Sequence, residues 1–271
     1  MKNSKTVYAL VESAIMIALA TVLSVIKIVD MPVGGSVTLA AMLPIMLIAY
    51  RHGTAWGLGA ATTYAFLQSL LGLENFSYVT GWQSVVAVLV LDYLLAYVLV
   101  GFGGIFRGVF KEQKWALASG AVLVCILRYA CHTIAGATVW AGLSIPSAAA
   151  LLYSLSYNAT YMIPETIILA AVSIYLGGII DFSRPVPTRT RAEKQTGARG
   201  SIAPVAWLIF LGGFVADVFM TAPYFQNEDG TLGIENLASA DWVAVMIVSL
   251  IAIAVGAGLL IYERVKKDSE K

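Results

Sequence analysis

Eight apolar stretches follow one another along this 271-residue chain, and most are close to the length at which a helix crosses a lipid bilayer. A bilayer core requires about 20 apolar residues per helix. Hydrophobic residues make up 59% of the chain and charged residues 12%, roughly half the charged share of ordinary soluble domains. The sequence therefore predicts an all-α integral membrane protein. The expected spans are residues 7–26, 36–50, 54–72, 82–103, 115–141, 150–178, 202–222 and 241–262.

The Lys and Arg residues predict how these spans are oriented. With the N-terminus placed in the cytoplasm, all but two of the 17 basic residues fall in segments on that same side. The exceptions are Lys27, in an outside loop, and Arg128, within a span. Short cytoplasmic loops carry an excess of Lys and Arg. We therefore expect a multi-pass protein of the plasma membrane with both termini in the cytoplasm.

A polar, basic segment divides the spans into two groups. Within residues 181–201, Pro185 and Pro187 prevent a continuous helix. We expect a six-helix unit over residues 1–180, a cytoplasmic linker over 181–201, and a two-helix hairpin with a cytoplasmic tail over 202–271. The linker is interpreted as a solvated loop, and contact with anionic lipid headgroups is the alternative.

Ionisable and aromatic side chains interrupt the fifth and sixth spans. Arg128, His132 and Trp140 drift slowly along one side of a single helix, because their spacings are four and eight residues. Ionisable residues inside a span usually face a bundle interior or a cavity, and they mark the path of a ligand or an ion. The next span carries polar side chains at intervals of four, with an amide beside them: Tyr153, Tyr157, Tyr161, Glu165 and Asn158. Together these residues indicate a polar site at membrane depth.

Each of these groups also has a purely structural interpretation. Asp92, in the fourth span, is either the ion-pair partner of Arg128 or the counter-ion of a cationic ligand. A lone His132 is more often a hydrogen-bonded core residue, and Trp140 alone fits the membrane interface. Glu12 lies near the cytoplasmic end of its span, where its carboxylate can reach water. The residues alone leave these alternatives open.

Several catalytic motifs are absent from the sequence. There is no GxxxxGK[ST] loop, so we expect that the chain does not itself hydrolyse ATP. HExxH, GxSxG and CxxC are also absent, which removes the usual anchors of protease and metalloenzyme chemistry. Cys125 and Cys131 are expected to be buried and unpaired, because they lie on different faces of one helix. The chain is predicted to be non-catalytic, with no metal, no cofactor and no nucleic-acid partner.

Four stretches of the first six spans carry a resemblance to a known family. They are Leu10–Ala20, Leu43–Gly53, the pair Asp92-Tyr93 with the following Gly101–Gly104, and the run from Arg128 to Asn158. Over about residues 7–180 the chain resembles the thiamine-specific substrate-binding (S) component of energy-coupling factor (ECF) transporters. The most specific part of the resemblance is the spacing of His132, Gly136, Trp140, Tyr153 and Asn158.

This resemblance implies a vitamin-binding membrane subunit. Such a subunit binds thiamine from outside and delivers it together with a transmembrane coupling protein and two ATPase subunits. Asp92 would face the thiazolium ring, while His132 and Trp140 would hold the aminopyrimidine. The other implied ligand contacts are Tyr64, Tyr93, Gly136, Tyr153 and Asn158. Ala14 and Ala18, a pair of small residues on the first helix, would dock the coupling protein.

The sequence departs from the family pattern at several places, one of which is the loop from Leu73 to Gln83, longer than usual. Asp92 stands where glutamate is usual, Tyr64 stands where tryptophan is usual, and the loop Lys27–Ser36 contains no tryptophan. Tyr78 and Trp82 are the candidates to supply the missing aromatic ring. Another vitamin, or a thiamine precursor such as hydroxymethylpyrimidine, is therefore the alternative ligand. A self-sufficient secondary transporter is the alternative function, and no role is predicted for the C-terminal hairpin.

Overall fold

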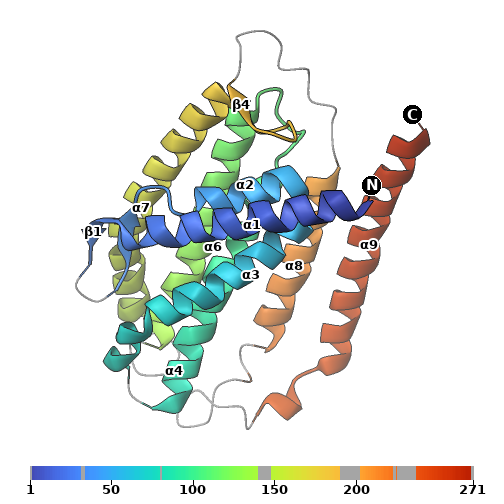
Figure 1. Cartoon of the computed structure of the whole chain (residues 1–271). Coiled ribbons are helices and arrows are strands. Elements are labelled where there is room, and N and C mark those ends of the chain that lie inside the picture. Colours follow the sequence, from blue (N-terminus) through green and yellow to red (C-terminus); the bar gives the residue numbers. More distant parts are fainter. Residues whose placement is uncertain are drawn as a thin grey trace. The chain divides into compact units, whose positions relative to one another are not determined.

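The computed structural model describes residues 2–31, 34–79, 81–139, 148–189, 202–221, 224 and 236–269. The described chain is mostly helical, with short strands and 3₁₀ turns between the helices (Figure 1). It divides into two compact units. Unit 1 holds the described residues up to 139 and those from 148 to 189, and unit 2 holds those from 202 onward.

Unit 1 is built from four long or medium helices around one short central helix. α6 and α7 pack along each other, and the short α2 contacts α1, α3 and α6. The bounds of these helices are α1 (Lys2–Val25), α2 (Leu43–His52), α3 (Thr54–Leu71), α6 (Gln113–Thr138) and α7 (Ala148–Ile179).

The fourth predicted span is a chain of short helical segments. It consists of α4 (Trp82–Val88), the π-helical segment η2 (Leu89–Leu95), α5 (Ala96–Val98) and the 3₁₀ segment η3 (Leu99–Gly104). Gly101 lies against α3 and Gly103 and Gly104 lie against α2, at positions where an added Cβ would overlap neighbouring atoms. π-helical turns are frequent at functional sites, and η2 carries Asp92 and Tyr93.

Five helices of the described chain are long and apolar enough to cross a membrane. They are Lys5–Val25, Trp82–Gly104, Gln113–Thr138, Ala148–Ile179 and Trp242–Lys266. The sequence predicted eight spans. α3 and α8 (Ala203–Thr221) form as helices at predicted positions, but neither is among these five. α2 has 10 residues and extends only about 15 Å, too short to cross a bilayer alone.

The predicted helix over residues 36–50 is wrong at its start. Ser36–Thr38 forms β2, which pairs antiparallel with β1 (Lys27–Asp30), and the helix begins only at Leu43. Pro44 lies in the first turn of α2, where a residue without an N–H is tolerated. A second small sheet pairs β3 (Ile180–Asp181) with β4 (Thr188–Arg189). The all-α prediction therefore missed two short strand pairs.

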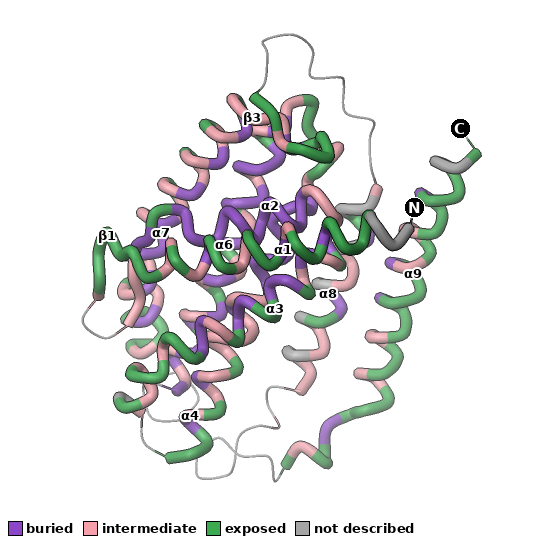
Figure 2. The backbone as a smooth tube through the Cα atoms, viewed as in Figure 1, coloured by how far each residue is buried: buried purple, intermediate pink, exposed green. Residues whose placement is uncertain are grey.

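The core of unit 1 is centred on α2. Every residue from Leu43 to Tyr50 is buried, and the tube in Figure 2 is purple along this helix. α1, by contrast, exposes a row of large apolar side chains that includes Leu10, Val11 and Ile15. In a membrane protein such a row faces lipid or another membrane protein. α2 differs from α1, because its apolar side chains are covered by other parts of unit 1.

Unit 2 contains two packed helices, α8 and α9 (Trp242–Ser269), with a short 3₁₀ turn, η5 (Leu237–Ser239), before α9. Ser249 Oγ donates a hydrogen bond of 2.6 Å to Asp217 Oδ2, so this pair joins the two helices. A Cβ on Gly256 would overlap the Phe210 ring, which shows how closely the helices approach. Both helices lie where the sequence predicted spans.

Candidate ligand-binding cavity

A cavity of about 940 Å³ opens within unit 1. Its walls come from the β1–β2 hairpin, α3, η1 (Leu73–Tyr78), η2, α6 and α7. All the predicted ligand-contacting residues that the structure describes line it: Tyr64, Asp92, Tyr93, His132, Gly136, Tyr153 and Asn158. Trp140, the remaining predicted contact, lies outside the described residues. The structure thus brings together residues that come from four separate helical segments.

Asp92 and His132 form a hydrogen-bonded pair in the cavity wall. His132 Nδ1 lies 2.8 Å from Asp92 Oδ1, and the two side chains are only 11% and 15% exposed. A hydrogen on Nδ1 must lie between them, because an ionised carboxylate can only accept. His132 Nε2 is buried and has no hydrogen-bond partner among the described residues. The pair therefore presents one imidazole nitrogen that a ligand can engage.

Arg128 lies one helical turn from His132 and is buried in the same wall. Its Nη1 donates to Met42 Sδ at 2.9 Å, and its guanidinium lies 4.5 Å from the centre of the Tyr97 ring. Nε has no partner within the described part of the chain. The sequence suggested an Asp92–Arg128 pair as the structural alternative, and the geometry supplies His132 as a partner for the carboxylate.

The tyrosines of α7 form a ladder along the cavity. The rings of Tyr153 and Tyr157 are stacked, with centroids 6.1 Å apart, and Tyr157 meets Tyr161 edge-on. The Tyr161 hydroxyl donates to Asn158 Oδ1, and Asn158 Nδ2 donates to Ser154 O at 2.8 Å. Asn158 is therefore oriented within its own helix before any ligand arrives. α7 itself continues through Pro164.

Gly136 allows α6 to approach α7 closely at this level. A Cβ on Gly136 would overlap Ser154 Oγ and would lie 3.5 Å from Asn158 Nδ2. Ser154 Oγ in turn donates to Thr133 O at 2.8 Å. The resemblance implied that Gly136 makes room for a ligand ring, and the structure adds a packing reason for glycine here.

The β1–β2 hairpin is fastened to α7 over the cavity. Glu165 accepts two hydrogen bonds from Thr38, one from its backbone N (2.6 Å) and one from Oγ1 (2.7 Å). Tyr157 donates to Gly34 O at 3.0 Å. Gly35 has φ +91°, and a Cβ there would lie 2.6 Å from the Tyr161 ring. The sequence marked Glu165 as polar but gave no sign of its partner, because 127 residues separate the two.

Tyr93 and Tyr64 line the cavity in different ways. The Tyr93 hydroxyl accepts from Asn75 Nδ2 (2.7 Å) and donates to Gly72 O (3.2 Å), so it holds η1 in place. Tyr64 is buried and meets Tyr97 edge-on.

Trp82, one candidate for the missing aromatic ring, is 70% exposed and does not line the cavity. The side chain of Tyr78, the other candidate, lies outside the described residues.

The predicted docking pair lies on α1 and does not line the cavity. Ala14 and Ala18 are both exposed, one turn apart on the same side of the helix. Two serines elsewhere around α1 bind α3: Trp56 Nε1 donates to Ser13 Oγ at 2.9 Å, and Gln68 Nε2 donates to Ser24 Oγ at 2.8 Å. α1 therefore combines a bound face with a free, small-residue face.

Comparisons with known proteins give the family. A family model described as "Thiamine transporter protein" matches residues 10–180. The chain belongs to this thiamine transporter family. The thiamine transporter ThiT of Bacillus subtilis is 34% identical over 183 residues, which make up 64% of this chain and 91% of that relative. A solved structure of ThiT from Listeria monocytogenes has a TM-score of 0.52 at 22% identity, covering 64% of this chain and 94% of that one.

Membership of the thiamine transporter family has two direct consequences. The protein is a multi-pass membrane transporter, a non-enzymatic kind of protein. Its ThiT-like fold covers the first part of the chain, where the cavity lies. The family match ends at residue 180, so α8 and α9 are additions to the shared thiamine transporter fold.

Proposed function

We propose that this chain is the thiamine-binding S component of an ECF importer. In this proposal unit 1 is a six-helix S-component bundle with a C-terminal membrane hairpin attached, and both termini are cytoplasmic. The chain captures thiamine from outside and delivers it with a coupling protein and two ATPases. The observation that carries the proposal is the single cavity in which Asp92, His132, Asn158 and the α7 tyrosines meet.

The charge of the cavity favours a cationic guest. Four acidic residues line it, Asp30, Glu74, Asp92 and Glu165, against two basic ones, Lys27 and Arg128. Thiamine carries a permanent positive charge on its thiazolium ring. A buried carboxylate with a cation beside it is the arrangement that membrane interiors tolerate. Asp92 is proposed as the group that faces the thiazolium.

The aromatic and hydrogen-bonding groups suit the rest of the molecule. Tyrosine faces attract a cation by about 0.5–2 kcal/mol each, and more when water is excluded. His132 Nε2, with its proton held on Nδ1 by Asp92, is an acceptor for the amino group of the pyrimidine. Tyr153 and Asn158 are proposed to supply further contacts. Few, well-placed polar groups in an apolar pocket are typical of small-molecule sites.

Calorimetric titration of the purified full-length chain tests this proposal. Thiamine is expected to bind in a one-to-one complex, and riboflavin is expected not to bind. Tighter binding of hydroxymethylpyrimidine than of thiamine would reassign the ligand to a thiamine precursor. Thiamine uptake into liposomes that contain this chain alone would identify a self-sufficient transporter and overturn the S-component role.

A further inference from the structure

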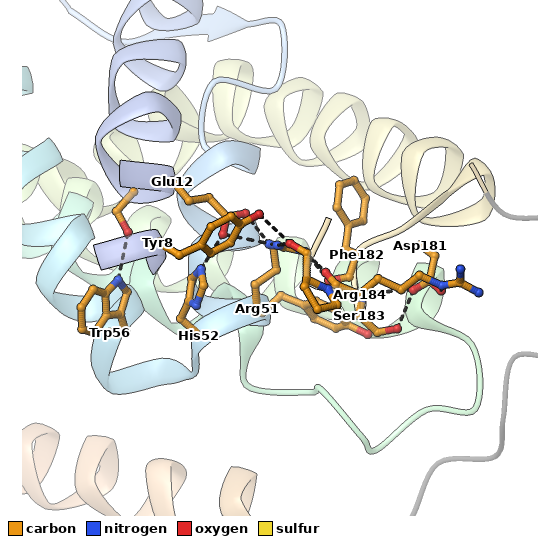
Figure 3. Close-up of polar contacts among 12 residues, drawn as sticks. Tyr8, Glu12, Arg51, His52, Trp56, Asp181, Phe182, Ser183 and Arg184 are labelled. Carbon is orange, nitrogen blue, oxygen red and sulfur yellow. Dashed lines mark hydrogen bonds and ion pairs between the residues drawn. The ribbon is translucent and has the colours of Figure 1, made fainter. Parts of the chain in front are cut away.

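The guanidinium of Arg51, near the end of α2, is surrounded by acceptors from two other parts of unit 1 (Figure 3). Nε donates to Glu12 Oε1, and Nη2 reaches Glu12 Oε2 at 3.3 Å. The remaining N–H groups point at main-chain carbonyls of residues 182, 184 and 185, at 2.6, 2.9 and 2.8 Å. The guanidinium has five N–H groups and makes five hydrogen bonds in this cluster. The Arg51 side chain is only 4% exposed.

Two further contacts bind α1 into this cluster. His52 Nε2 lies 2.7 Å from Glu12 Oε2, so the carboxylate of Glu12 is held by two consecutive residues of α2. The Tyr8 hydroxyl donates to Pro185 O at 2.5 Å. α1 is thus attached both to the end of α2 and to residues 182–185, which we call the strap. The sequence interpretation of Glu12 as a carboxylate that reaches water missed this cluster.

The strap is also fixed from the side of α6. Gln113 donates to Gly177 O at 2.9 Å and accepts from Phe182 N at 3.1 Å. Burial alone would raise the pKa of the Asp181 carboxyl, but hydrogen bonds from Ser183 and Arg184 outweigh it and hold that pKa below its ordinary value. The Arg51 side chain binds the main-chain carbonyls of the strap. The geometry of these hydrogen bonds therefore does not depend on the side chains of the strap.

A cluster of this kind has a mechanical consequence. Buried ion pairs often add little net stability compared with apolar packing, but the removal of one partner is strongly unfavourable. Glu12 is two residues from Ala14 on the same helix, and the small-residue face of α1 is exposed while Glu12 points into unit 1. A partner that docks on this face can move the cavity only if α1 moves together with the rest of unit 1.

We propose that Arg51, Glu12 and the strap form a clamp that fixes α1 to unit 1, so that the Ala14–Ala18 face is presented rigidly to the coupling protein. This inference rests on the proposed function for the identity of the partner. The strap follows directly after the family-matched residues 10–180. The clamp therefore also fixes the point from which the C-terminal addition leaves unit 1.

The first experiment separates thiamine binding from thiamine uptake in the full-length chain. Arg51→Gln and Glu12→Gln are each expected to keep the thiamine dissociation constant within about twofold. Uptake by host cells that supply an energy-coupling module is expected to fall by about tenfold or more, because breaking a buried pair frees α1. Arg184→Gln is the matched control and should transport normally, since Arg51 binds the Arg184 carbonyl and not its exposed side chain.

The second experiment reports on the clamp without thiamine or a partner. A short bismaleimide is applied to the variant Tyr8→Cys with Pro185→Cys, in which the native Cys125 and Cys131 are buried. Cross-linking is expected to be efficient in this background and about fivefold weaker when Arg51→Gln is added, because removal of a hydrogen-bonded buried charge releases the strap.

Three results would overturn the inference. Normal uptake by both Arg51→Gln and Glu12→Gln would show that the clamp is not needed for coupling. Loss of thiamine binding in the same variants would show that the cluster supports the whole of unit 1 and not the presentation of α1. Unchanged cross-linking would refute the clamp itself. If the wild-type chain fails to bind thiamine, the proposed function fails, and the cross-linking comparison still decides whether the clamp exists.

Discussion

Asp92 has two partners in the proposed site, the Nδ1–H group of His132 and the positively charged thiazolium of the ligand. Asp92→Asn keeps the size of the side chain and removes its charge. We expect thiamine affinity to fall by about tenfold or more, or ~1.4 kcal/mol, because the thiazolium then lacks its counter-ion. Calorimetric titration of the purified variant measures the change.

Asp217→Asn is the matched control for this prediction. It makes the same chemical change in unit 2, where Asp217 accepts from Ser249 and does not line the cavity. Its thiamine affinity should equal that of the wild type. Unchanged affinity in Asp92→Asn would mean that the carboxylate serves only to orient His132.

Glu165 is a buried carboxylate of the cavity, and both its oxygens accept hydrogen bonds from Thr38. Glu165→Gln replaces one acceptor with an NH₂ group that faces a donor. We expect the free energy of unfolding to fall by ~1–3 kcal/mol, the cost of leaving a buried polar group badly paired. Hydrogen exchange in residues 36–38 should rise at the same time.

Glu74→Gln is the comparison for Glu165→Gln, because Glu74 also lines the cavity but is exposed. It should leave both unfolding and hydrogen exchange unchanged. If Glu165→Gln unfolds like the wild type and its hairpin is equally protected, then Glu165 does not hold the hairpin on α7.

The sequence could point to individual candidate site residues only where their side chains were unusual for a membrane span. A carboxylate, an imidazole and an amide are conspicuous among apolar neighbours, and Asp92, His132 and Asn158 all reach one cavity. Their partners were less visible. Asn75, in η1, binds Tyr93, and Thr38, in β2, binds Glu165; both lie in short elements between the spans, where polar residues are ordinary.

At the scale of elements, the contact between α6 and α7 depends on the absence of a side chain at Gly136. Gly136→Ala places a Cβ onto Ser154 Oγ. We expect this substitution to lower the free energy of unfolding by ~1–3 kcal/mol, the usual cost of overpacking. Adding Ser154→Ala removes the clashing atom and should recover part of the loss, although it also removes the hydrogen bond to Thr133 O.

Gly178→Ala in α7 provides the control for Gly136→Ala. No atom lies within 4 Å of a Cβ at Gly178, and alanine is favoured over glycine inside a helix by about 0.5–1 kcal/mol. This variant should be at least as stable as the wild type in thermal unfolding. Equal stability of Gly136→Ala would show that α6 and α7 can separate without cost.

Apolar length predicted the long helices well and the short ones poorly. α1, α6, α7 and α9 coincide with runs long enough to span lipid. Hydropathy cannot tell whether an apolar run is buried by lipid or by protein, and α2 is buried by protein. The β1–β2 hairpin was missed because contacts with α7 hold it, and its own sequence pattern is too short to reveal it.

At the scale of the whole molecule, all the described residues that line the cavity belong to unit 1. Its lining residues extend from Ser24 to Glu165 and so lie within the family-matched residues 10–180. The sequence analysis placed the end of the resemblance at about residue 180, and the family match also ends at residue 180. The sequence could assign no role to α8 and α9, since nothing in two apolar helices specifies a partner.

This organisation leads to a prediction for a shortened chain. A protein that ends after residue 189 retains every cavity residue and the strap. We expect its thiamine dissociation constant to stay within about twofold of the full-length value, because every described residue that lines the cavity belongs to unit 1. Circular dichroism and size-exclusion chromatography confirm that the shortened chain is folded before titration. A folded but non-binding protein would mean that the C-terminal helices shape the site, and thiamine capture would then require both units.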